Sequence, residues 1–352
     1  MPIDHLATEL LLHIFRSCDS VADVLNLSFV CRRLHRVLNS TSKLHILASA
    51  AETEFGPLDD IIQVVTQNES QPAHLIRYAP MSDSLLKQVI QLGLVARKWE
   101  TIYPFKKWKV DFENRRSLTN EERLRLRRAV YRLWLYHSAF HSGVYDRHSR
   151  SLRHVVLERA QLLHNWSTQE LAEIEDLRLV INGTIQRKFR KRYPDSSQQL
   201  SFNIHLNYPL SSTTSLSSHD NSLLRKGPDT SIQQYFHTAH PSNYAESPAK
   251  YRFRFRNDLS HDPGYEGWGD EIPHYYIMQD MLKLDPGQIL WLRDHALLKE
   301  QVEEYVWSLG EWFRNNGETF GDTLEYVMNE RGVEVGELRS GVADRDMGIV
   351  LN

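Results

Sequence analysis

Apolar side chains recur every three or four positions along most of this chain, which is the spacing of one face of an α-helix. The pattern is clear at residues 82–99, 119–143, 167–193, 284–313 and 319–332. Only KYRFRFR, residues 250–256, alternates polar and aromatic side chains, as a short strand or docking segment does. The periodicity therefore predicts an all-α fold.

Capping residues stand where these helices should begin and end. Thr119 with Glu122, and Ser167 with Glu170, have the capping-box spacing that satisfies backbone N–H groups at a helix start. The other signals are Ser82 or Asp83, Asp285 followed by Pro286, and Gly332 at a helix end. We therefore expect residues 284–313 to form one long helix.

The expected core faces follow from the same spacing. They are Leu85, Val89, Leu92 and Ala96; Leu126, Val130, Leu133 and Trp134; Leu171, Ile174, Leu177 and Ile181; and Ile289, Leu292, Ala296, Leu297, Val302 and Val306. We find no repeat of fixed period, which argues against a leucine-rich repeat or a propeller.

The helical pattern stops after Tyr193. From Pro194 to about Asp262 the chain is rich in Ser, Thr, Asn, His and Pro, and it includes SSTTSLSSHDNS. Such a stretch buries too little apolar surface to offset the entropy lost on ordering. We interpret residues 194–262 as a flexible loop or linker.

The first forty residues form a separate pattern of three short helices. The first carries Leu6, Leu10 and Ile14 on one face, and Leu11 and Phe15, each one position further along the chain, widen that apolar face. Asp19 and Ser20 form a turn and cap before the second helix, which carries Val24, Leu25 and Leu27; the third carries Val30, Cys31, Leu34, Val37 and Leu38. A unit of this size cannot stabilise itself by its own core, so the rest of the chain or a partner must cover it.

These residues resemble the F-box in their order as well as their character. The matching positions are Leu6, Glu9-Leu10-Leu11, Ile14-Phe15, Asp23-Val24-Leu25, Leu27, Val30-Cys31-Arg32 and Leu38. Ala7 stands at the usual proline, and Leu34 stands where many members have tryptophan. The resemblance covers about residues 2–40. The remainder is similar only in composition to C-terminal regions of F-box proteins from filamentous fungi.

The resemblance implies a substrate adaptor. In that family the three helices interlock with a Skp adaptor, which is held by a cullin–RING ubiquitin ligase. The residues expected to contact the Skp adaptor are Leu6, Leu10, Leu11, Ile14, Phe15, Val24, Leu25, Leu27, Val30, Cys31, Leu34 and Leu38. The alternative is a helical hairpin folded onto the chain's own core.

Composition places the protein in the cytoplasm or the nucleus. Two cysteines, Cys18 and Cys31, are too few for a disulfide framework and suit a reducing compartment. No apolar run approaches the roughly 20 residues needed to span a bilayer. The N-terminus lacks the positive region of a signal peptide. We expect no membrane association.

Charge is distributed unevenly along the chain. Residues 97–193 hold 22 Lys and Arg against 11 Asp and Glu, a net charge of +11, whereas residues 265–352 hold 7 against 18, a net charge of −11. Two solvated faces, or two halves of one domain that attract each other, explain this; a basic surface for an acidic partner is the alternative. RKFRKRYP, residues 187–194, suits a helix C-terminus, or else nuclear import or nucleic-acid contact.

Candidate catalytic and metal-binding motifs fail on inspection. His137 and His141 are four residues apart, but no glutamate follows His137 and no third ligand is placed. GYEGWGD, residues 264–270, lacks the strand–helix setting and the following lysine of a phosphate loop. No serine lies in a G-x-S-x-G elbow. We therefore expect no enzyme activity, no metal and no cofactor.

Together these observations predict four regions. They are an F-box at 1–40, a helical body at 41–193 with a basic second half, a flexible loop at 194–262, and an acidic helical segment at 263–352 that packs on the body. The favoured function is a substrate-recognition adaptor of a cullin–RING ubiquitin ligase, with an unknown protein client bound by the body. The alternative is a nucleic-acid-associated or regulatory protein that uses residues 97–193.

Overall fold

A computed structural model of the chain describes residues 6–39, 43–109, 111–113, 115–145, 152–189, 280–296, 298–310, 312–313 and 317–352. Within these ranges thirteen helices form and no strand does, which confirms the all-α prediction. The helices are α1 (Thr8–Arg16), α2 (Val21–Phe29), α3 (Arg32–Leu38), α4 (Lys43–Phe55), α5 (Leu58–Val65), α6 (Asp83–Lys107), α7 (Asn120–Phe140), α8 (Arg153–His164), α9 (Thr168–Phe189), α14 (Pro286–His295), α15 (Lys299–Ser308), α16 (Phe320–Glu330) and α17 (Val335–Asp344). None of the described helices is long and apolar enough to cross a membrane.

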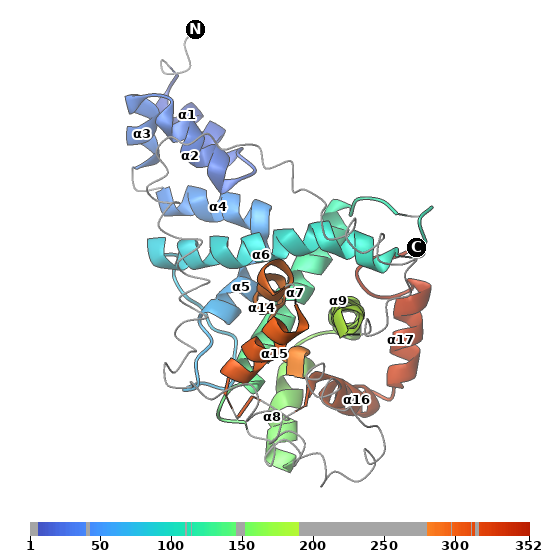
Figure 1. Cartoon of the computed structure of the whole chain (residues 1–352). Coiled ribbons are helices and arrows are strands. Elements are labelled where there is room, and N and C mark those ends of the chain that lie inside the picture. The colour runs from blue at the N-terminus through green and yellow to red at the C-terminus, as the bar shows by residue number, and fades with distance from the viewer. Residues whose placement is uncertain are drawn as a thin grey trace, which may run out of the picture.

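The helices are arranged as an N-terminal unit and a larger body. Helices α1–α3 project from one end of the molecule, and α4 lies between them and α6 (Figure 1). In the body α6, α7 and α9 pack on one another, and α5 packs on α6 and α7. Helix α14 contacts α6 and α7, α16 contacts α8, and α17 contacts α9. The C-terminal helices thus complete the body.

Several predicted helix starts are confirmed in atomic detail. Thr119 Oγ1 accepts from the Glu122 N–H while Glu122 accepts from the Thr119 N–H, and Ser167 and Glu170 exchange the same two bonds. The predicted core residues of α6, α7 and α9 are buried, apart from Leu92, which is partly exposed. Gly332, with φ of +73°, follows α16 as predicted.

The prediction of one long helix over 284–313 is wrong. Helix α14 ends at His295 and α15 begins at Lys299. At the break the backbone of Ala296 leaves helical geometry, with φ −104° and ψ 81°, and Gln301 Oε1 caps the Leu298 N–H at 3.0 Å. The side chains Ile289, Leu292, Ala296, Val302 and Val306 are still buried. Because both pieces keep the same apolar spacing, the periodicity did not reveal the break.

Some predictions cannot be compared with the described structure. Residues 194–262, KYRFRFR and GYEGWGD all lie outside the described residues, as does the end of RKFRKRYP beyond Phe189. The division of the chain at residues 40, 193 and 262 stays a prediction.

A buried carboxylate on α9 holds three parts of the body together. Asp176 accepts hydrogen bonds from the Tyr103 hydroxyl at 2.6 Å and from Lys107 Nζ at 2.8 Å, both on α6. It also accepts from the Ile349 N–H at 3.1 Å, and the side chains of Ile349 and Val350 are buried. A buried carboxylate is stable only when it is paired and hydrogen-bonded, and these donors meet that requirement. The C-terminal tail is therefore part of the core.

Helix α4 joins the N-terminal unit to the body through close packing at Gly93. A Cβ atom added to Gly93 on α6 would overlap the ring of Phe55, the last residue of α4. The Phe55 carbonyl also accepts a hydrogen bond from the Tyr131 hydroxyl of α7 at 2.8 Å. The neighbouring residue of α4, Glu54, contacts both units. Its Oε2 accepts from the Val21 N–H of α2 at 3.0 Å, and its Oε1 pairs with Arg97 of α6 at 2.6 Å. The glycine therefore sets how closely α4 and α6 approach.

We expect Gly93→Ala to destabilise the protein by up to about 2 kcal/mol. Overpacking of a core costs about 1–3 kcal/mol, and the gain of about 1 kcal/mol in helix propensity offsets only part of it. Gly183→Ala on α9 is the matched control, because nothing lies within 4 Å of a Cβ there. The control should be neutral or gain about 0.5–1 kcal/mol. Urea unfolding of both variants tests this, and a Gly93→Ala protein as stable as Gly183→Ala would contradict it.

Candidate functional site

The N-terminal unit is held by caps at its helix junctions. Ser20 caps α2, as predicted, by accepting from the Asp23 N–H at 3.0 Å. Cys31, expected to be a contact residue, caps α3, and its Sγ accepts from the Leu34 N–H at 3.5 Å. Both cysteines are free thiols. The caps fix where each helix turns into the next.

The start of α1 is positioned by α3. Ala7 occupies the N-cap of α1 and has no side chain that can cap it. Instead the Arg33 guanidinium of α3 donates to the Leu6 carbonyl at 2.6 Å. A charge-assisted hydrogen bond of this length is among the stronger ones in proteins. It therefore holds the segment at which Ala7 replaces the proline of the F-box pattern.

Five of the twelve expected contact residues are buried within the chain. Leu11 and Phe15 of α1 are fully buried, and α1 packs on α3 and α4. The other buried members are Val24, Leu34 and Leu38. These side chains form the core of the unit together with Ile46 and Leu47 of α4. The fourth helix thus provides part of the cover that three short helices need.

The other seven residues remain accessible to different degrees. Leu10 is 52% exposed and Val30 is 67% exposed. The partly exposed members are Leu6, Ile14, Leu25, Leu27 and Cys31. Leu10 and Ile14 are four residues apart and so share one face of α1. No atomic contact with a partner tests the twelve assignments, which stay predictions.

Phe29 was missed by the sequence reasoning. It is the last residue of α2, is 59% exposed, and stacks on His35 with ring centroids 6.3 Å apart. It stands directly before Val30, so the available signal was two consecutive apolar residues at a helix end. An exposed aromatic side chain beside another exposed apolar one is typical of an interaction surface.

The fold and these surfaces define a helical protein with a small N-terminal docking unit carried on a larger body. Residues 3–45 match the model of the F-box-like family, so the chain carries an F-box-like domain in its first 45 residues. The match runs into α4, in agreement with the packing of that helix on α1 and α2. Comparison with curated proteins and with solved structures finds no match.

The basic region faces carboxylates of the same chain. Ion pairs shorter than 3.1 Å join Arg127 to Glu100, Arg128 to Glu173, Arg132 to Asp60 and Glu170, and Arg178 to Glu318. The last of these connects the basic region with the acidic C-terminal segment. These guanidinium groups are thus already engaged within the fold, and that of Arg178 pairs with the acidic segment.

His137 and His141 are part of the packing between α7 and the C-terminal segment. His137 Nδ1 lies 2.8 Å from the Leu284 carbonyl, and His141 Nδ1 lies 3.3 Å from the Lys283 carbonyl. Burial lowers the pKa of His137 to about 3, so the ring is neutral at physiological pH. Among the described residues no group of three or more potential ligands is placed to hold a metal ion.

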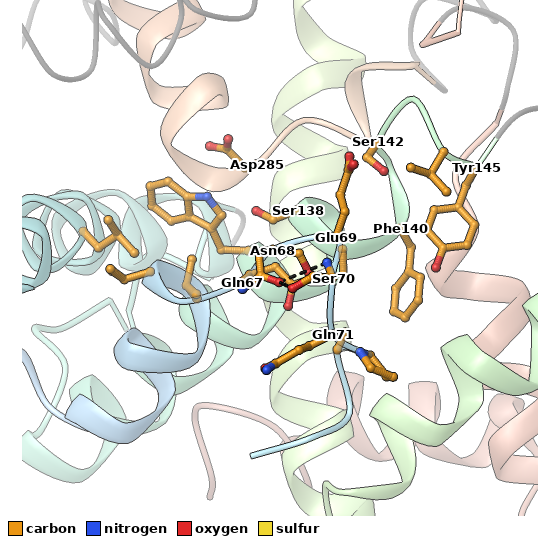
Figure 2. A pocket seen from close by; sticks show the side chains of 18 of the residues that line it. Gln67, Asn68, Glu69, Ser70, Gln71, Ser138, Phe140, Ser142, Tyr145 and Asp285 are labelled. Atoms are coloured by element: carbon orange, nitrogen blue, oxygen red, sulfur yellow. Dashed lines mark hydrogen bonds between the residues drawn. The ribbon is translucent and has the colours of Figure 1, made fainter. Parts of the chain in front are cut away.

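The body contains a pocket of about 900 Å³. It is lined by the end of α5 and the segment 67–73 that follows, by α6, by the end of α7 with the residues after it, by Glu158 of α8 and by the start of α14 (Figure 2). In Figure 2 Asp285 and Ser138 lie on one side of the opening, and Phe140 and Tyr145 lie on the other. Sequence reasoning did not find this site, because its walls come from positions more than 200 residues apart.

Asp285 has two roles at this pocket. Its Oδ1 accepts from the Gln288 N–H at 2.8 Å, which makes it the N-cap of α14, as predicted. Its side chain also lines the pocket, where burial raises the pKa to about 7, although hydrogen bonds from the Gln288 and Gly287 backbone act in the opposite direction.

The raised pKa predicts a pH-dependent effect of Asp285→Asn. The folded protein retains a proton on Asp285 between the ordinary pKa of 3.8 and about 7, so wild type loses stability as pH rises through this range. Asparagine also caps helices but does not ionise. Each pKa unit corresponds to about 1.4 kcal/mol, so the variant should gain roughly 1–4 kcal/mol relative to wild type between pH 4 and pH 8.5.

Urea unfolding of both proteins at several pH values measures this difference. All other titrating groups, including His137, are common to the two proteins and cancel in the comparison. If the free energies of unfolding of wild type and variant change in parallel with pH, the carboxyl group is ionised to the same extent in the folded and unfolded states. That outcome would contradict the prediction.

Proposed function

We propose that this protein is a non-catalytic adaptor subunit of a cullin–RING ubiquitin ligase. Its F-box-like domain docks on a Skp-type adaptor, and its helical body binds a protein client. The protein works in the cytoplasm or the nucleus. The observation that carries the proposal is the match of residues 3–45 to the F-box-like family, on a unit whose surface exposes apolar side chains.

The docking surface is proposed to centre on Leu10, Phe29 and Val30. They are the large apolar residues of α1–α3 and their turns with more than a third of their surface exposed, within residues 6–39. Ile14 and Leu27 extend this surface as partly exposed neighbours. Each such side chain contributes about 1.5–3 kcal/mol when a partner buries it fully. Leu11 and Phe15 support the surface from beneath by fixing α1 on α4.

The body supports a presenting role by its position. Helices α1–α3 and α8 lie at opposite ends of the molecule (Figure 1). None of the described residues that line the pocket belongs to α1–α4. A client held there would leave the docking unit free for its adaptor.

Leu10→Asp and Val30→Asp should each weaken Skp binding at least tenfold without unfolding the protein. Each places a charge in an interface that requires an apolar side chain, and interface hot spots lose 2 kcal/mol or more on truncation. Co-purification with a Skp adaptor and titration of the purified proteins measure the loss. Leu124→Asp on α7 is the matched control, since Leu124 is 44% exposed but belongs to the body.

The three variants should have thermal midpoints close to that of wild type, because each replaces an exposed side chain. If both N-terminal variants bind the Skp adaptor as well as Leu124→Asp does, the docking surface is misassigned. If wild type itself does not bind, the adaptor function is wrong.

A further inference from the structure

The pocket in the body has a strongly biased chemistry. Three carboxyl groups, from Glu69, Glu158 and Asp285, line it, and no Lys, Arg or His does so among the described residues. Five side-chain amides also line it, from Gln67, Asn68, Gln71, Gln88 and Gln91. Among the residues that line it, the pocket is therefore acidic and rich in amide groups.

Aromatic rings form its apolar surfaces. Phe140 and Tyr145 meet edge to face, with centroids 5.6 Å apart, and the Tyr145 hydroxyl donates to Glu158 at 2.9 Å. Trp134 lies against α14, and a Cβ on Gly287 would approach its ring to 2.9 Å. The aromatic faces are thus fixed in place by packing and by a hydrogen bond, so the pocket is largely pre-formed.

A buried acceptor at the rim is without a partner. Gln67 Oε1 is inaccessible to solvent and makes no hydrogen bond, while its amide nitrogen donates to the Asn68 carbonyl at 3.3 Å. A buried polar atom without a partner costs roughly 1–3 kcal/mol. A donor brought by a ligand would remove that cost.

We propose that this pocket receives an arginine side chain from an extended segment of the client. A guanidinium group offers five N–H donors in a plane, which suits carboxylate and amide oxygens, and it stacks on aromatic faces. Lysine carries the same charge, but its ammonium group lacks the planar, forked arrangement of donors. The volume of about 900 Å³ exceeds one side chain, so neighbouring client residues also enter.

This inference deepens the proposed function and rests on it, because it names what the body recognises in a client. The charges near the pocket are consistent with it. Arg159 acts electrostatically on Tyr145, but it is buried, has a partner of its own and does not line the pocket. The client's guanidinium would therefore meet Glu69 and Glu158 without competition from a lining cation in the part of the chain that the structure describes.

The test uses the full chain in complex with a Skp adaptor. Arrays of nonapeptides carry a fixed central Arg, Lys, Gln or Glu and mixed residues elsewhere, and the best Arg peptide is titrated by fluorescence anisotropy. We expect the peptides to be retained in the order Arg, Lys, Gln, Glu. The affinity for the Arg peptide should be at least tenfold higher than that for the Gln peptide. Affinity should fall as salt is added, because screening weakens the ion pairs.

Glu158→Gln and Glu69→Gln should each lower the affinity for the Arg peptide about tenfold. Both changes remove a charge and keep the shape, and glutamine at 158 still accepts from Tyr145. Glu325→Gln is the matched control, because Glu325 is an exposed residue of α16 that does not line the pocket. It should bind the peptide as wild type does.

The outcomes separate this inference from the adaptor function. If the complex with Skp forms but Arg and Glu peptides bind equally, or none binds, the pocket inference is overturned and the docking function stands. If the chain alone selects Arg peptides but does not bind Skp, the pocket chemistry stands and the adaptor function fails. Equal losses in Glu158→Gln and Glu325→Gln would also overturn the pocket inference.

Discussion

The packing of Phe55 against Gly93 fixes how the N-terminal unit is mounted on the body. Because glycine has no side chain, α4 approaches α6 closely, and the buried Phe55 fills the space a side chain would take. Glu54 adds an electrostatic connection, since one carboxylate oxygen accepts from α2 while the other pairs with α6. Helix α4 is therefore shared by the unit and the body, and a shared helix transmits orientation better than a linker does.

Because α4 belongs to both parts, it explains how so small an N-terminal unit can be stable. Three helices of nine, nine and seven residues are too small to be stable on their own. The fourth helix covers Leu11 and Phe15, which leaves Leu10 and Val30 on the outside. The apolar residues of the unit thus divide into a set that holds it together and a set that is free to bind. On α1, self-burial accounts for Leu11 and Phe15, whereas Leu10 is left exposed on another face of the helix.

Local signals in the sequence predicted the body well where a cap or a periodic face decided the structure. The capping boxes at Thr119 and Ser167, and the cap at Asp285, depend only on residues three positions apart. The break between α14 and α15 has no such signal, because no Gly or Pro marks Ala296 to Leu298 and both pieces bury the same face. The sequence also did not predict that Leu10 is exposed while Leu11 is buried, because this difference depends on where α4 packs.

The pocket shows why the second half of the function lies beyond sequence reasoning. Its acidic residues come from the α5–α6 connection, from α8 and from the start of α14, and none of these forms a motif alone. The start of α14 is fixed on α6, where Trp99 Nε1 donates to the Pro286 carbonyl at 3.2 Å. The C-terminal segment that completes the core thus also supplies Asp285 and Gly287 to the pocket wall. A body lacking this segment would lose Asp285 and Gly287 from the pocket wall. The proposed docking surface and the pocket are therefore built from different helices, and α4 packs on both the N-terminal unit and α6.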